Sequence, residues 1–67
     1  MTKRQAEALQ FISAFINENL YSPSYREITS GMNLSSVSNA HSLVAALVDQ
    51  GKLKKLDRRS RTIEVVK

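Results

Sequence analysis

The stretch LSSVSNAHSLVAALVDQG, residues 34–51, decides the fold. Its apolar residues recur at helical spacing, so we expect a helix that is capped by Ser35 or Ser36 and stopped by Gly51. At about 100° per residue, one side of this helix gathers the apolar residues, and we expect that side to enter the core. These residues are Val37, Ala40, Leu43, Val44, Leu47 and Val48.

The opposite side of the same helix carries short, neutral, hydrogen-bonding side chains in its first two turns. An ordinary solvated face more often carries Glu, Lys, Gln or Arg, whereas the first charge here is Asp49. Base edges in the DNA major groove present donors and acceptors that Asn and Ser side chains can match. We therefore predict base reading, with N-capping or an ordinary surface role as the alternative. The predicted base-reading residues are Ser36, Ser38, Asn39, His41 and Ser42.

The N-terminal segment predicts a long amphipathic helix over residues 3–19. Thr2 followed by Gln5 has the pattern of a capping box, in which each side chain bonds to the backbone of the other residue. Behind it the apolar residues again recur at helical spacing, which predicts a second face of the core. They are Ala8, Leu9, Ile12, Phe15, Ile16 and Leu20.

A second capping box, formed by Ser24 and Glu27, predicts a short helix over about residues 25–30. Gly31 is expected to end this helix, in the left-handed conformation that helix ends often need. A tight turn should follow and leave Leu34 pointing inward. A short helix, a tight turn and a longer helix form the helix-turn-helix plan, whose second helix lies in the DNA major groove.

The C-terminal segment changes from helical to strand character. Residues 52–56 and 62–66 mix aliphatic and polar side chains, and DRRSR, residues 57–61, lies between them. We predict two strands joined by a turn, with the register left open because the alternation is imperfect. The predicted fold is mainly α with a small β-hairpin, a single winged helix-turn-helix domain over residues 1–67.

Positive charge is concentrated in this hairpin. Residues 1–50 hold three cations and four anions, a net charge of −1, whereas residues 51–67 hold seven cations and two anions, a net charge of +5. Such a pole favours a polyanionic partner, although the same charges can also keep a strand edge from pairing with other chains. We predict contacts to the DNA backbone or minor groove, with a packing role as the alternative for Tyr25. The candidates are Ser24, Tyr25, Lys54, Lys55, Arg58, Arg59 and Arg61.

Composition argues against several other classes of protein. The chain has no cysteine, which excludes a disulfide scaffold and a thiolate metal site. His41 is the only histidine and the six acidic residues are scattered, so we expect no catalytic centre, no metal site and no small-molecule cofactor. Polar residues interrupt the N-terminal apolar pattern, so we expect no signal peptide, no membrane contact and a cytoplasmic protein.

Three stretches, MTKRQAEALQFISAFI, YSPSYREI and SSVSNAHSLVAALVDQGKLKK, resemble the N-terminal DNA-binding domain of the LexA repressors. In that family a T-x-x-Q helix start, a P-[ST]-x-x-E-I second helix and a third helix closed by Gly recur in this order. The resemblance implies a winged helix, operator binding on double-stranded DNA, and dimers on palindromic sites. By position, the family's base-contacting residues fall on the five residues predicted above.

Departures from the family pattern qualify what the resemblance implies. Val37 stands where Pro is common, and Ser38-Asn39-Ala40-His41-Ser42 replaces Asn-Ala-Ala-Glu-Glu, so a different operator is expected. We expect the family's self-cleaving domain to be absent, so no autoproteolysis is inferred. The chain is expected to be either a fragment of a longer repressor or a small regulator of a phage or mobile element, and Met1 directly before the helix cap favours the second.

The alternative function is that of a protein-interaction module that modulates a host repressor or RNA polymerase. Exposed apolar residues would favour it, and Phe11 and Val48, at the edges of their stripes, are the candidates. On DNA we expect a homodimer or association with another regulator, because one module of this size buries only about 600–1,000 Å².

Overall fold

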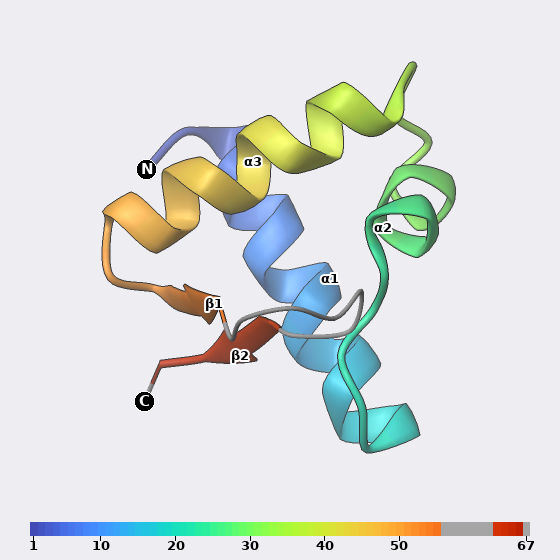
Figure 1. Cartoon of the computed structure of the whole chain (residues 1–67), viewed down its shortest axis with the longest axis vertical. Helices are drawn as coiled ribbons and strands as arrows, with labels where there is room; N and C mark the ends of the chain where they lie inside the picture. The colour runs from blue at the N-terminus through green and yellow to red at the C-terminus, as the bar shows by residue number, and fades with distance from the viewer. Residues whose placement is uncertain (56–62, 67) are drawn as a thin grey trace.

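Three helices followed by a two-stranded hairpin make up the fold (Figure 1). The computed structural model describes residues 1–55 and 63–66. The elements are α1 (Lys3–Asn19), α2 (Tyr25–Gly31), α3 (Val37–Asp49), β1 (Leu53–Lys55) and β2 (Ile63–Val65). Their order and type confirm the predicted winged helix-turn-helix fold.

Both predicted capping boxes are present. At the start of α1, Thr2 Oγ1 accepts a hydrogen bond of 3.1 Å from the backbone N–H of Gln5, and Gln5 Oε1 accepts one of 3.1 Å from that of Thr2. At the start of α2, Ser24 Oγ accepts from the N–H of Glu27 at 3.1 Å, and Glu27 Oε1 accepts from that of Ser24 at 2.8 Å. Each box satisfies backbone donors that a helix start leaves without a partner.

The turn between α2 and α3 differs from the expectation at one residue. Gly31 is the last helical residue of α2, and the left-handed residue is Asn33, with φ of 56°. Around Asn33 the backbone N–H of Leu34 donates to the carbonyl of Thr29 at 2.9 Å, which is the bond pattern of a Schellman motif. Asn tolerates this conformation better than most residues. Leu34 is half-buried against the core, as predicted.

Gly31 has a different physical role from the one predicted. The ring of Phe11 on α1 lies so close to its Cα that any Cβ at this position would overlap the ring. A glycine here therefore lets the C-terminal end of α2 approach α1.

Gly51 ends α3 as predicted. Its φ is 74°, and the N–H of Lys52 donates to the carbonyl of Leu47 at 2.9 Å while the N–H of Gly51 donates to that of Val48 at 3.0 Å. This Schellman motif closes the helix and turns the chain into β1.

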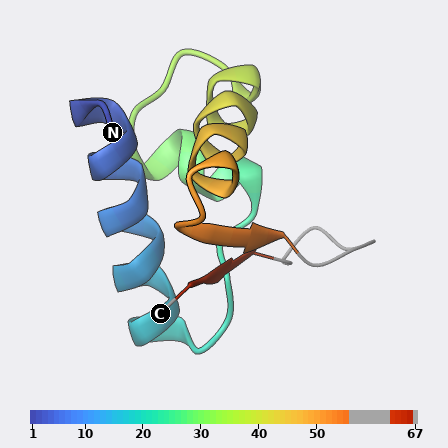
Figure 2. The same ribbon diagram turned by 90° about the vertical axis from the view of Figure 1, so that its left-hand side faces the viewer.

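The two strands are antiparallel, with Leu53 opposite Val65, Lys54 opposite Glu64 and Lys55 opposite Ile63. They are shorter than the predicted 52–56 and 62–66, and the predicted turn lies outside the described residues. Figure 2 shows β1 running away from α1 and β2 returning toward it. The base of the hairpin is anchored because Leu53 and Ile63 are buried, and because Ser22 Oγ, before α2, accepts a long hydrogen bond of 3.4 Å from the N–H of Ile63.

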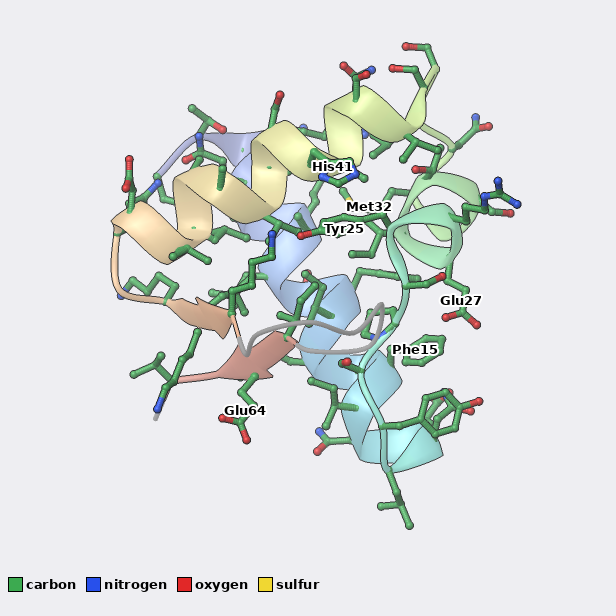
Figure 3. The ribbon with its side chains drawn as sticks, viewed as in Figure 1. Phe15, Tyr25, Glu27, Met32, His41 and Glu64 are labelled. Atoms are coloured by element: carbon green, nitrogen blue, oxygen red, sulfur yellow. The ribbon has the colours of Figure 1, made fainter. Side chains whose placement is uncertain are left out.

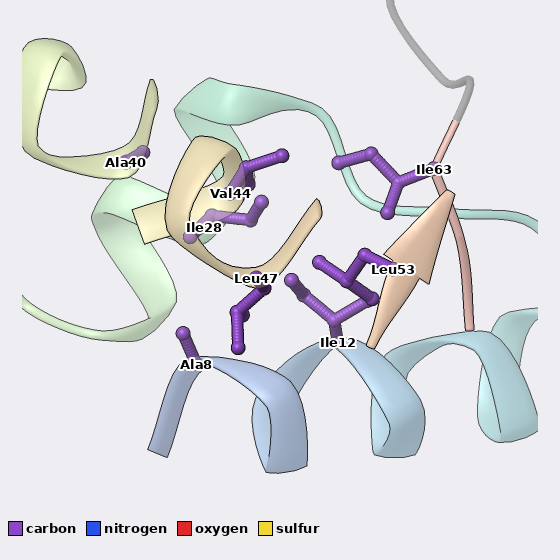
Figure 4. Packing of buried hydrophobic residues seen from close by; sticks show 8 residues of the cluster. All are labelled: Ala8, Ile12, Ile28, Ala40, Val44, Leu47, Leu53 and Ile63. Carbon is purple, nitrogen blue, oxygen red and sulfur yellow. The ribbon is translucent and has the colours of Figure 1, made fainter. Parts of the chain in front are cut away.

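The core joins all five elements, and α3 supplies the largest share of it (Figure 4). The inward side of α3 meets α1 on one flank and α2 on the other, while the hairpin closes the remaining side. The buried cluster consists of Ala8, Ile12, Ile28, Ala40, Val44, Leu47, Leu53 and Ile63.

Three apolar residues lie elsewhere than predicted. Val37 is 38% exposed, because it precedes by almost one turn the point where α3 first enters the core at Ala40. Leu20 is 87% exposed, because it caps α1 in the left-handed conformation, with φ of 64°, and the chain reverses there. Phe11, weighed as an exposed docking candidate, is instead half-buried against the core. Val48, weighed both as a core residue and as a docking candidate, lies half-buried against the core, which confirms the first role.

We predict that Gly31→Ala lowers the free energy of unfolding by about 1–3 kcal/mol, the usual cost of overpacking, because the new methyl group overlaps the ring of Phe11. Urea unfolding measures this change. In a Phe11→Leu background the same substitution should be neutral or stabilising, since Ala favours helix over Gly by roughly 1 kcal/mol. A loss of equal size in both backgrounds would contradict the assigned contact.

Candidate nucleic-acid interface

The buried side of α3 determines which of its residues face outward. Ala40, Val44 and Leu47 are between 0% and 2% exposed, so the opposite side of the helix faces solvent. Ser38 and Ser42 lie on this outward side, and helical geometry puts His41 on one flank and Asn39 on the other. All five predicted base-reading residues, Ser36 included, are exposed.

The first turn of α3 is organised by Ser35 and Asn39. Ser36 occupies the N-cap position, but its side chain makes no capping hydrogen bond. Asn39 Nδ2 donates instead to Ser35 Oγ at 2.7 Å, which ties the amide to the residue before the cap. An Asn amide carries two N–H hydrogens and a carbonyl oxygen, so this bond orients the group and leaves it further hydrogen-bonding capacity.

His41 is stacked on Tyr25, the first residue of α2. The two ring centroids are 3.7 Å apart and the ring planes make an angle of 19°. Figure 3 shows the two side chains one above the other between α3 and α2. Tyr25 is half-buried and packs against the core, which confirms the packing role weighed for it. No sequence signal reveals the stack, because the partners belong to different helices.

One basic side chain of the described hairpin, Lys55, lies near the His41 side of this face. Lys54 and Lys55 are exposed, and Lys55 Nζ lies 5.8 Å from the centroid of the Tyr25 ring. The hydroxyl of Ser24 is occupied by the cap of α2. The candidates Arg58, Arg59 and Arg61 lie outside the described residues.

Arg4 is a candidate that sequence reasoning missed. It lines an open hollow of about 380 Å³ beside the first turns of α3, together with Ser35, Asn39 and Ser42 among others. Its guanidinium is 3.6 Å from Glu7, and both side chains are about half exposed, so this surface ion pair holds it weakly. Arg4 gives no signal in the sequence, because only the folding of α1 against α3 brings it to this face.

The described part of the chain offers neither a metal site nor a membrane span. Within residues 1–55 and 63–66, no three His, Asp or Glu side chains gather closely enough to hold a metal ion. Over the same residues no helix combines the length and the apolar character needed to cross a bilayer.

A short helix, a tight turn, a longer helix with a polar outward face and a basic hairpin beside it define a winged helix-turn-helix domain. A sequence model described as the LexA DNA binding domain matches residues 1–62. The chain belongs to the LexA DNA-binding domain family, and the resemblance inferred from its motifs is thereby confirmed.

Curated relatives match along the whole chain. LexA repressors of Koribacter versatilis, Pelagibacter ubique and Erythrobacter litoralis are 40%, 37% and 34% identical to it over 67 residues. The chain covers 32%, 30% and 29% of these three repressors, so it spans about a third of their length.

We predict that Ser24→Ala lowers the free energy of unfolding by about 1 kcal/mol, because it removes the side-chain half of a capping box. Ser36→Ala, at the N-cap of α3, is the matched control and should cost clearly less, since Ser36 makes no such bond. Urea unfolding of the two variants checks this. Equal losses would contradict the assigned caps.

Proposed function

We propose that the chain is a sequence-specific reader of double-stranded DNA and acts in transcriptional repression. The observation that carries this proposal is the polar face of α3, which remains exposed in a chain of the LexA DNA-binding domain family. The relatives named above are repressors, which favours the same outcome here. The expectations of a cytoplasmic location and of a phage or mobile-element origin stay predictions.

In this proposal α3 enters the major groove and its outward residues contact base edges. Ser and Asn side chains are short, so the helix can approach closely, and an Asn amide can pair with adenine N6 and N7. The bond from Asn39 to Ser35 supports this role because it orients the amide before DNA arrives. The proposed readers are Ser36, Ser38, Asn39, His41 and Ser42.

The hairpin is proposed to hold the DNA backbone or to reach the minor groove. Lys54 and Lys55 are exposed on β1, whereas the outward face of α3 carries no charge before Asp49. Phosphate contacts position a protein on DNA, whereas base contacts select the DNA sequence. In this proposal the hairpin makes the phosphate contacts and α3 makes the base contacts. Ser24, Tyr25, Arg58, Arg59 and Arg61 remain further proposed contacts, to which the position of Arg4 adds one.

Two copies on adjacent half-sites are proposed for the bound state, with association to another regulator as the alternative. The domain measures 25 × 23 × 22 Å, which is shorter than the roughly 34 Å of one turn of DNA. A single copy therefore reads one half-site. No cofactor and no catalytic step enters this proposal.

A protein-interaction module is the second candidate, and exposed apolar residues favour it. Leu20 is 87% exposed and its neighbour Tyr21 is 48% exposed, at the corner between α1 and α2. These two residues replace Phe11 and Val48 as the candidates for a protein contact.

Selection of duplexes from a random pool tests the proposed function, with the gel shift followed against protein concentration. We expect a defined site with two-fold symmetry and two copies per duplex. Alanine at Ser38, Asn39 and Ser42 together should lower the preference for the selected site over random DNA at least tenfold, since one hydrogen bond to a base edge contributes about 1 kcal/mol.

Alanine at Gln10 and Asn17, exposed polar residues of α1, is the matched control and should leave that preference unchanged. The DNA-reading proposal would be contradicted by a pool that yields no enriched sequence, or by a triple variant that keeps the wild-type preference for the selected site. Capture of a protein partner that depends on Leu20 and Tyr21 would then support the second candidate.

We predict that Lys54→Gln and Lys55→Gln weaken binding to all duplexes alike. Removal of one lysine that neutralises a phosphate should make the slope of log K against log salt less steep by about 0.9. Lys52→Gln is the matched control. It also removes one positive charge, but Lys52 lies before β1, next to the C-terminal end of α3, so this variant should change the slope less. An unchanged slope in the two strand variants, or a weakening confined to one sequence, would contradict a backbone role.

A further inference from the structure

A face-to-face ring contact joins the start of α2 to the outward side of α3. The rings of Tyr25 and His41 lie 3.7 Å apart at an angle of 19°. Tyr25 is half-buried against the core, whereas His41 is exposed. The stack therefore covers one face of the imidazole, while His41 as a whole stays exposed (Figure 3).

The tyrosine side of this stack is well anchored. Ser24, directly before Tyr25, is held by the capping box of α2. The backbone carbonyl of Tyr25 accepts a hydrogen bond of 2.7 Å from Thr29 Oγ1. These bonds fix the backbone of Tyr25, and packing against the core holds its ring. A ring held in this way restricts the rotamers of His41, so less side-chain entropy is lost when the imidazole binds a partner.

The positive charge beside the stack indicates which kind of base edge the imidazole of His41 would bind. Lys55 Nζ lies 5.8 Å from the centroid of the Tyr25 ring, which puts a cation beside the pair. Positive charge favours acceptors over donors on the partner. Among the base edges of the major groove, guanine offers two adjacent acceptors, N7 and O6, whereas adenine N7 lies beside an amino donor.

We propose that Tyr25 is a positioning residue that holds the His41 imidazole edge toward the major groove, where its N–H donates to N7 of a guanine. This inference rests on the proposed DNA-reading function and deepens it. His41 is then a specificity-determining residue, and its contribution depends on the ring beneath it.

The stack itself is tested on the protein without DNA, by NMR. In the stacked arrangement the ring protons of His41 are shifted upfield by the Tyr25 ring. Tyr25→Leu should move them downfield, whereas Tyr25→Phe should leave them in place because it keeps the ring. Tyr21→Leu is the matched control, since the Tyr21 ring packs edge-on against Phe15. Histidine proton shifts unaffected by Tyr25→Leu would overturn the inference.

The readout is tested on the selected duplex by replacing its guanines, one at a time, with 7-deazaguanine, which lacks N7. Wild type should lose about fivefold in affinity at one position, the effect of one hydrogen bond. His41→Phe, which keeps a ring on Tyr25 but has no N–H donor, should show no loss there. Tyr25→Leu should also lose this sensitivity, while Tyr25→Phe and Tyr21→Leu should retain it.

The outcomes separate this inference from the proposed function. A pool without an enriched duplex contradicts the proposed function. The NMR comparison needs no DNA, so it still tests whether His41 stacks on Tyr25. An enriched duplex with no guanine N7 sensed through His41 overturns the inference and leaves DNA reading intact. Full sensitivity in a folded Tyr25→Leu variant overturns the positioning role.

Discussion

The seating of α3 in the core is the constraint on which the rest of the structure depends. Its inward residues Ala40, Val44 and Leu47 pack in one cluster with Ile12 of α1 and Ile28 of α2. Burying an aliphatic side chain stabilises a fold by about 1.5–3 kcal/mol, whereas a whole domain is stable by only about 5–15 kcal/mol. Rotation of α3 would expose several of these residues together, so the helix has one stable orientation. Its outward face follows from that orientation.

Charge and hydrogen-bonding capacity are divided between two elements. The outward face of α3 has small hydroxyl and amide groups, and Lys55 of β1 lies near its His41 side, over the Tyr25 ring. Buried Leu53 and Ile63 fix the base of the hairpin to the same core that seats α3. One hydrophobic cluster therefore places both the face proposed to read sequence and the strand proposed to hold phosphates. The Tyr25 ring, which meets both His41 and Lys55, lies where the two regions join.

Local patterns made most of the fold predictable from the sequence. The capping boxes at Thr2 and Ser24 and the stop at Gly51 depend on residues within a few positions, and the buried stripe of α3 follows from helical periodicity. The failures arose where tertiary contacts decide. Periodicity assigns Val37 and Leu20 to the apolar side but does not say where a helix leaves the core. Gly31 does end α2, but the left-handed conformation expected there falls on Asn33, and the missing side chain of Gly31 serves the contact with Phe11. The stack of His41 on Tyr25 and the approach of Arg4 to α3 bring together segments that are distant in the sequence, so no local pattern predicts them.

An amide NMR titration of the protein with its selected duplex tests the central claim most directly. If the seating of α3 defines a DNA-reading face, the largest shift changes should fall on residues 36–42 and on Lys54 and Lys55. The exposed polar side of α1, including Gln10 and Asn17, should change little. Changes centred on Leu20 and Tyr21, with the α3 signals unmoved, would contradict the account.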